Sequence, residues 1–315
     1  MKVSFIIPVY NCEKYVAECI ESVLANRCDF YEQEIVLIDD GSKDSSGAIC
    51  DRYAAGHPEI KVIHQVNQGV SVARNAGLDV ATGEWVMFID ADDILRRDAM
   101  RKLYEEAEFY KYDTTRFGAY LFGDGKGERT YKRGRLYSEN IEVYRNMILA
   151  NDTMHGVWGG IYRMCIITDK HVRFKPGMKY GEDWLVLFNI LCHTQSFSYF
   201  NADLYGYRFN PASAMHVKHS HIRLDSYGVL GILLGYAEEA GVTLSDKAIE
   251  RHKSQLCVSA IRFALSNHSR AAFVEAEEVM SAYCKLPYRT IMSHCKSNKQ
   301  RIGVIVYRFI KNLIL

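Results

Sequence analysis

The chain has 315 residues, of which 48% are apolar and 24% are charged, and its formal net charge is only +1. These values are typical of a globular protein with a large core, built as one large domain or as a domain with a smaller one. The low net charge gives no reason to expect a nucleic-acid partner. The apolar run VSFIIPV is too short for a cleaved signal peptide, and no run reaches the roughly 18 apolar residues of a spanning helix.

The first hundred residues alternate between short apolar runs and amphipathic helical patterns. In chain order the pattern predicts strand 3–10, helix 13–25, strand 34–40, helix 44–55, strand 60–65, helix 69–81 and strand 84–90. Apolar strands separated by helices are typical of a parallel sheet with helices on both faces. The sequence therefore predicts a doubly wound α/β fold with a mostly parallel sheet over residues 1–110.

The periodicity is weaker after residue 110. It predicts further strands at 114–123 and 197–209 and a helix over 183–193, and it becomes helical from about residue 219. We therefore expect a first domain over residues 1–215, with halves at 1–110 and 111–215, and a helical C-terminal extension over 216–315.

Acidic side chains stand where the predicted strands end. Asp39 and Asp40 end the second strand, and Asp90, Asp92 and Asp93 end the fourth. Ligands of open α/β sheets bind beyond these carboxyl ends, and carboxylates this close together repel unless a cation neutralises them. Mn²⁺ or Mg²⁺ takes one or two carboxylates and completes its shell with water and phosphates, which predicts a nucleoside diphosphate here. Taken singly, each motif is also explained as a turn or a helix N-cap.

The C-terminal residues form a basic amphipathic tail. Residues 285–315 contain seven lysines and arginines and no acidic residue, whereas residues 1–110 contain 20 acidic and 11 basic residues. Apolar residues alternate with basic ones through this tail, a pattern typical of a helix that lies on a membrane surface. A terminal helix docked on its own domain explains the same pattern, so both interpretations stay open.

Five motifs occur in one order, and together they resemble the family 2 inverting glycosyltransferases with the GT-A fold. They are PVYN, VLIDDGSKDSS, NQGVSVARNAGLDVATGEW, FIDADD and GEDW. The resemblance covers about residues 1–210. It implies a GT-A-like sheet whose residues 1–110 bind the nucleotide-sugar and whose residues 111–215 bind the acceptor.

The resemblance also implies roles for single residues of the donor site. Pro8 and Tyr10 would line the base pocket, and Asp40, with Asp39 beside it, would bind the uracil ring. Arg74 and Asn75 would lie under the diphosphate and the sugar. Asp90 would lie near the ribose or sugar and Asp92 would be the metal ligand.

Asp183 falls where this family keeps its general base. In an inverting reaction a base takes the proton of the acceptor hydroxyl while the metal stabilises the leaving diphosphate. Its neighbour Glu182 would bind the acceptor or tune Asp183, and Trp184 would stack on an acceptor sugar or pack in the core. His216 is a further candidate for the metal site.

We therefore expect a metal-dependent enzyme that transfers a sugar from a UDP-linked donor to a saccharide or lipid-linked saccharide, in polysaccharide or lipopolysaccharide synthesis. Nine cysteines, an odd number without a CxxC pair, indicate reduced thiols and a cytoplasmic location, peripheral on the inner membrane face if the tail binds lipid. Two alternatives are a non-catalytic nucleotide-sugar-binding or membrane-scaffold subunit and a sugar-phosphate nucleotidyltransferase. The second lacks support, because PVYNCEKY has no glycine-rich, basic signature.

Overall fold

The structure is a computed structural model, and it describes residues 1–123, 125, 127–131, 138–178, 180–209, 224–267 and 269–314. The chain divides into two compact units. The first contains Met1–Tyr144 and Thr153–Pro211, and the second contains Arg145–Asp152 and Ala212–Leu315. The second unit thus includes a short segment from the middle of the chain, which the sequence pattern did not indicate.

The first unit is built on one sheet with strand order β3-β2-β1-β4-β8-β6-β9-β5, and β7 pairs with β6. Its strands are β1 Lys2–Val9, β2 Glu32–Asp39, β3 Ile60–His64, β4 Trp85–Phe88, β5 Ile94–Leu95, β6 Thr114–Phe122, β7 Arg129–Thr130, β8 Gly160–Arg163 and β9 Phe197–Arg208. The pairs among β1, β2, β3 and β4 are parallel. Strand β8 is antiparallel to both β4 and β6, so the sheet is mixed beyond β4.

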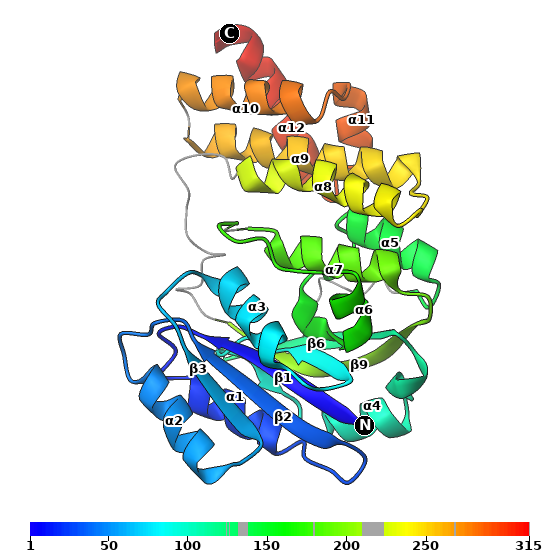
Figure 1. Cartoon of the computed structure of the whole chain (residues 1–315). Coiled ribbons are helices and arrows are strands. Elements are labelled where there is room, and N and C mark those ends of the chain that lie inside the picture. Colours follow the sequence, from blue (N-terminus) through cyan, green and yellow to red (C-terminus); the bar gives the residue numbers. More distant parts are fainter. Residues whose placement is uncertain are drawn as a thin grey trace. The chain divides into compact units, whose positions relative to one another are not determined.

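Helices cover both faces of this sheet (Figure 1). Those of the first unit are α1 Val16–Leu24, α2 Ser46–Gly56, α3 Val70–Val80, α4 Ala99–Glu105, α6 Met164–Asp169 and α7 Glu182–His193. Because side chains alternate along a strand, β1 packs Phe5 and Ile7 with α1 and turns Ile6 toward α3. A Cβ at Gly77 would lie 2.5 Å from Ile6 Cγ2, so glycine lets α3 approach the sheet closely.

The predicted strands and helices of residues 1–110 are all present, with ends shifted by a few residues. The predictions missed the short elements β5, β8, α4 and α6, the helix α5 Ile141–Leu149, and the 3₁₀ turns Phe109–Lys111 and Val157–Gly159. Most of these are too short to show a period of their own, and tertiary pairing determines them instead. An antiparallel strand such as β8 also needs no long helical crossover before it, so the sequence around it lacks the strand–helix–strand pattern of a parallel strand.

The second unit is helical, as predicted, and has its own apolar core. Besides the end of α5, it contains α8 Leu224–Glu239, α9 Asp246–Asn267, α10 Arg270–Tyr283, α11 Tyr288–Ser293 and α12 Asn298–Ile314. None of the helices in the described part of the chain combines the length and apolar character that crossing a bilayer demands. All nine cysteines are free in the structure.

Candidate functional site

A cavity of about 390 Å³ lies at the carboxyl ends of β1, β2 and β4. Five of the predicted site residues line it, namely Pro8, Tyr10, Asp40, Asp90 and Asp92. The remaining lining residues are Val9, Cys12, Asn67, Gly69, Val70, Ala73 and Ala91. Parallel strands bring their carboxyl ends to one edge of the sheet, which explains why residues far apart in sequence meet here.

Asp40 is held at this edge by the loop before α3. Its Oδ1 accepts hydrogen bonds from Gln65 Nε2 (2.7 Å) and Gln68 N (2.9 Å), and its Oδ2 accepts one from Gly69 N (2.8 Å). Gly69 has a φ of 88°, a left-handed conformation that side-chain-bearing residues rarely adopt. The NQG sequence therefore fixes the direction of the Asp40 carboxylate.

Asp39 lies outside the cavity lining, which differs from its expected place among the substrate-binding residues. Its Oδ1 accepts a hydrogen bond from Ser42 N (3.0 Å), and its Oδ2 lies 2.9 Å from His64 Nδ1. Burial favours the neutral acid, but the hydrogen bonds from Ser42 and His64 outweigh it and lower the pKa of Asp39. The carboxylate thus holds the loop after β2 against the end of β3.

The turn at Asp90–Asp93 is anchored by strand β9. Tyr205 donates its hydroxyl proton to Asp93 Oδ2 (2.8 Å) and accepts a hydrogen bond from Asp90 N (3.0 Å). Arg208 donates from its backbone to Asp93 Oδ1 (2.8 Å) and from Nε to the carbonyl of Asp92 (2.7 Å). Burial, followed by the charges of Asp90 and Asp92, raises the pKa of Asp93 well above its usual range. Asp93 therefore supports the turn, and Asp92 remains beside the cavity.

Arg74 joins Asp90 to the predicted base. The guanidinium is buried on α3, and it donates from Nη2 to Asp90 Oδ1 (2.8 Å) and from Nη1 to Asp183 Oδ1 (2.6 Å). Glu182 Oε1 lies 3.5 Å from Nη1, and the Phe174 ring centroid lies 5.1 Å from the guanidinium carbon. Burial opposes the charged form of Arg74, but Asp183, Asp90 and Glu182 raise its pKa. The cluster therefore contains one cation and three carboxylates.

Asp183 stands in the first turn of α7, which begins after Gly181. Burial raises the pKa of Asp183 to about 7, because it outweighs the lowering effect of Arg74, and the charges of Glu182 and Asp90 act in the same direction as burial. A general base works best when its pKa lies near the working pH, because it is then both ionised and basic. The environment of Asp183 suits this role better than that of an exposed carboxylate.

Asn75 and Trp184 do not point into the cavity. Asn75 donates from Nδ2 to the carbonyl of Phe174 (2.8 Å) and accepts at Oδ1 from the Phe174 N–H (2.9 Å), so its amide binds backbone instead of the expected substrate. Trp184 is buried, and its ring lies 4.8 Å from that of His155. Of its two expected roles, the structure therefore favours core packing. His216 lies outside the described residues.

The carboxylates fit a cation that is completed by substrate. Among the residues that the structure describes, no group of three or more His, Cys, Asp or Glu side chains forms a metal-binding cluster. Mg²⁺ in nucleotide sites usually takes one or two carboxylates and binds phosphates for the rest, so Asp92 at the cavity wall meets that requirement. Oxygen ligands accept Mn²⁺ as well.

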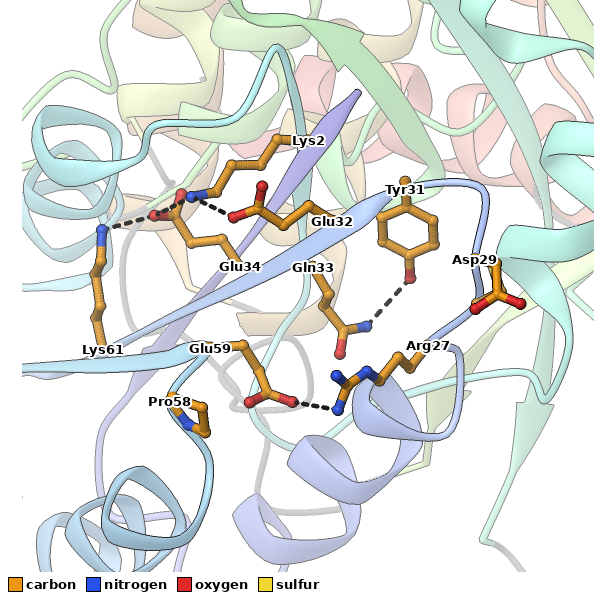
Figure 2. A pocket seen from close by; sticks show the side chains of 11 residues that line it. Lys2, Arg27, Asp29, Tyr31, Glu32, Gln33, Glu34, Pro58, Glu59 and Lys61 are labelled. Atoms are coloured by element: carbon orange, nitrogen blue, oxygen red, sulfur yellow. Dashed lines mark hydrogen bonds and ion pairs between the residues drawn. The ribbon is translucent and has the colours of Figure 1, made fainter.

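A larger cavity of about 470 Å³ lies at the amino ends of β1 and β2 (Figure 2). Glu34 is one of its lining residues, and its carboxylate accepts hydrogen bonds from Lys61 Nζ (2.7 Å), Ser4 Oγ (2.5 Å) and the backbone N–H of Thr82 (2.8 Å). None of the predicted site residues lines this cavity. Ion pairs join Lys2 to Glu32 and Glu34, Lys61 to Glu34, and Arg27 to Glu59, so we assign this cavity to the framework.

Sequence reasoning missed the residues that hold the site. Gln65 and Gly69 orient Asp40, and Tyr205 and Arg208 orient the turn at Asp90–Asp93. The glycine of the NQG motif was an available signal for a tight approach. Tyr205 and Arg208 carry no such signal, because the turn that they contact is more than a hundred positions away.

Comparison with known proteins identifies relatives of this chain. It is 31% identical over 225 residues to Glycosyltransferase GlyA of Streptococcus pneumoniae, covering 69% of this chain and 32% of that protein. It is 33% identical over 217 residues to Uncharacterized glycosyltransferase EpsJ of Bacillus subtilis, covering 67% of this chain and 62% of that protein. The chain thus spans less than two thirds of either relative.

A structural comparison matches TarS 1–349 of S. aureus in complex with UDP-GlcNAc, with a TM-score of 0.71, 21% sequence identity, and coverage of 99% of this chain and 91% of that one. This likeness confirms the predicted GT-A-like fold. The model of the family described as Glycosyl transferase family 2 matches residues 4–170, which contain the donor-side motifs as well as the elements β1 to β8. Because the matched residues make up more than half of the chain, the chain belongs to glycosyl transferase family 2.

Proposed function

We propose that this chain is a metal-dependent inverting glycosyltransferase that transfers a sugar from a UDP-linked donor to a saccharide hydroxyl. The observation that supports this most is the contact of one buried guanidinium, Arg74, with both Asp90 and Asp183. It joins the carboxylates beside the nucleotide cavity to a carboxylate whose pKa is suited to a general base. Membership in the family supports the same chemistry.

In the proposed reaction Asp183 accepts the proton of the acceptor hydroxyl, whose oxygen forms the new bond to the anomeric carbon. The bond from that carbon to the donor diphosphate breaks on the opposite side, so a single displacement inverts the configuration. Asp92 would hold a divalent cation, and that cation would stabilise the negative charge of the leaving diphosphate. Arg74 keeps Asp183 and Asp90 in a fixed relation through both contacts.

The hydrogen bonds of Asp40 favour uracil over guanine. A carboxylate offers about four acceptor positions, and three at Asp40 are used by Gln65, Gln68 and Gly69 among the described residues. The remaining position, on Oδ2, suits the single N3–H of uracil, whereas guanine presents two neighbouring donors. The TarS structure, which has the same fold, contains UDP-GlcNAc, and this supports a UDP-linked donor here.

The acceptor is proposed to be a saccharide or a lipid-linked saccharide of a bacterial polysaccharide or lipopolysaccharide pathway. Residues 111–215 would recognise it, and residues 1–110 would bind the donor. The relatives named above come from bacteria, which is consistent with such a pathway. A lipid-linked acceptor would place the enzyme in the cytoplasm, at the inner face of the membrane.

Calorimetric titration of UDP and GDP, with and without Mn²⁺, tests the donor site. We expect Mn²⁺-dependent UDP binding that Asp92→Asn removes and that Asp79→Asn leaves unchanged, because Asp79 forms an exposed ion pair with Arg173 away from the cavity. Preference for GDP would contradict the assignment of Asp40. Binding of neither nucleotide would contradict the donor site and favour the non-catalytic scaffold.

A further inference from the structure

The C-terminal helix α12 has two apolar faces, and only one is used within its unit. The inner face contains Val304 and Tyr307, which are 1% and 0% exposed. The Tyr307 ring stacks on that of Phe273 at 5.1 Å, and its hydroxyl donates to Glu277 Oε1 (3.0 Å). Lys311, on the same face, forms an ion pair with Glu277. The tail is therefore docked on α9 and α10 by this face, as one of the two interpretations of the sequence predicted.

The outer face is apolar as well, although water surrounds it. Ile302, Ile305 and Val306 are 60%, 58% and 39% exposed. Their spacing of three and four residues places them in one stripe along the helix. Three exposed branched side chains in a row cost solvation free energy in water, so a stripe of this kind usually marks an interaction site.

Basic residues border the stripe on both sides. With about 100° per residue, Arg301 and Arg308 lie on one flank, two turns apart, and Lys299 lies on the other. All three are exposed. Residues 285–315 contain no acidic residue, and Arg308 contacts an aromatic ring, with its guanidinium carbon 5.6 Å from the Tyr288 ring centroid. Long basic side chains at such flanks can reach the phosphates of a bilayer while the apolar stripe enters its surface.

We propose that the outer face of α12, formed by Ile302, Ile305 and Val306 with Arg301, Arg308 and Lys299, docks on an anionic lipid surface. The charge of the flanks selects this occupant over a neutral apolar partner, because anionic headgroups match cations on both sides of the stripe. This proposal deepens the membrane location suggested above by naming the face that binds.

Co-sedimentation with vesicles tests the proposal on the full chain. The probes are vesicles of phosphatidylcholine alone and of phosphatidylcholine mixed with phosphatidylglycerol. We expect binding to the anionic vesicles only, weakened by salt. Arg301→Gln and Arg308→Gln should each lower the partition coefficient about fivefold. The double variant Ile302→Ser with Ile305→Ser should lower it about tenfold or more.

Matched controls come from the same unit. Val274→Ser changes a partly exposed apolar residue of α10, and Lys247→Gln changes an exposed basic residue at the start of α9, so neither should alter vesicle binding. Every variant should bind UDP with the affinity of the wild type. Measuring this affinity separates failure of the membrane proposal from failure of the donor site.

Three results would overturn the proposal. One is equal binding to neutral and anionic vesicles, and another is binding that the outer-face variants leave unchanged. The third is sedimentation equilibrium that reveals a dimer abolished by Ile302→Ser with Ile305→Ser, because a second copy of the chain would then cover this face.

Discussion

At the scale of single residues, the ionisation of Asp183 determines when the proposed reaction can run. Burial raises its pKa to about 7, so a large part of the carboxylate is protonated in mildly acidic solution. Only the deprotonated form can accept the proton of the acceptor hydroxyl. The residue therefore connects the packing around α7 to the pH dependence of catalysis.

The value of kcat/KM should rise with pH and level off above about pH 7, since this parameter reports the ionisation of the free enzyme. The measurement is the initial rate of UDP release at a fixed low donor concentration between pH 5 and pH 9. Glu182→Gln should move the midpoint to lower pH, because it removes a neighbouring negative charge that raises the pKa of Asp183. A rate that is constant down to pH 5 would contradict Asp183 as the base.

Removing Arg74 should destabilise the fold and alter the same pH profile. Arg74→Gln leaves three buried or half-buried carboxylates without their cation, which costs about 3–5 kcal/mol of unfolding free energy. Arg74→Lys retains the charge and should recover part of this loss. Urea denaturation measures the stability of both variants.

In the folded fraction of Arg74→Gln, the midpoint of the pH profile should move upward, because Arg74 lowers the pKa of Asp183. A purely structural role for Arg74 would change the stability and leave the midpoint where it is in the wild type. That outcome would contradict the coupling between Arg74 and the base.

At the scale of elements, strand β9 holds the turn that contains Asp90 and Asp92. Tyr205→Phe deletes one hydroxyl, which serves both Asp93 and the backbone of Asp90, and keeps the ring stacked on Trp158. We expect a loss of about 1–3 kcal/mol in stability and weaker Mn²⁺-dependent UDP binding.

Tyr31→Phe is the matched control for this change. Tyr31 is also a buried tyrosine, and its hydroxyl donates to the Asn26 carbonyl (2.9 Å). Neither residue lines the cavity that contains Asp90 and Asp92. The control should lose a comparable stability and keep UDP binding. If both variants bind UDP equally well, β9 does not position the metal-binding turn.

The amino ends of β1, β2 and β3 are joined by Glu34 (Figure 2). Burial favours its neutral form, but hydrogen bonds from Lys61, Ser4 and Thr82 outweigh this and lower the pKa of Glu34 to about 2. An ionised carboxylate whose pKa is lowered in the folded state stabilises the fold. This contribution is fully present when the pH is above the unfolded-state pKa near 4.5, and it is lost as the pH falls toward 2.

Glu34→Gln should therefore lower the unfolding free energy by about 2 kcal/mol at neutral pH, and the difference from wild type should shrink between pH 5 and pH 2. Urea denaturation at several pH values measures this, with Glu32→Gln as a control on an exposed neighbour. A difference that is independent of pH would contradict the ionised state of Glu34. UDP binding should not change in either variant.

At the scale of the whole molecule, the sequence predicted the parallel half of the fold well, because its strands and helices each show a clear period. Five residues of the motifs, Pro8, Tyr10, Asp40, Asp90 and Asp92, line one cavity in the structure. A sequence motif does not predict which group a side chain hydrogen-bonds in the folded protein. Asn75 binds the backbone of Phe174, and Asp39 binds Ser42 and His64.

The pairing of Arg74 with Asp183 could not be predicted from one sequence either, since the two residues are 109 positions apart. It depends on how α3 and α7 pack in the folded unit, and no local pattern encodes that. The basic amphipathic tail illustrates the same limit. Its composition predicted a basic amphipathic helix, but only the structure separates Val304 and Tyr307 from the exposed Ile302 and Ile305.

The most direct test is UDP release by wild type and Asp183→Asn, measured with Mn²⁺, a panel of UDP-sugars and a mixture of saccharide acceptors. We predict that one donor is turned over by the wild type, and that the variant is slower by about a hundredfold or more while its affinity for UDP is unchanged. Equal rates in the two proteins, or no turnover of any donor by the wild type, would contradict the assignment of Asp183 and of glycosyl transfer.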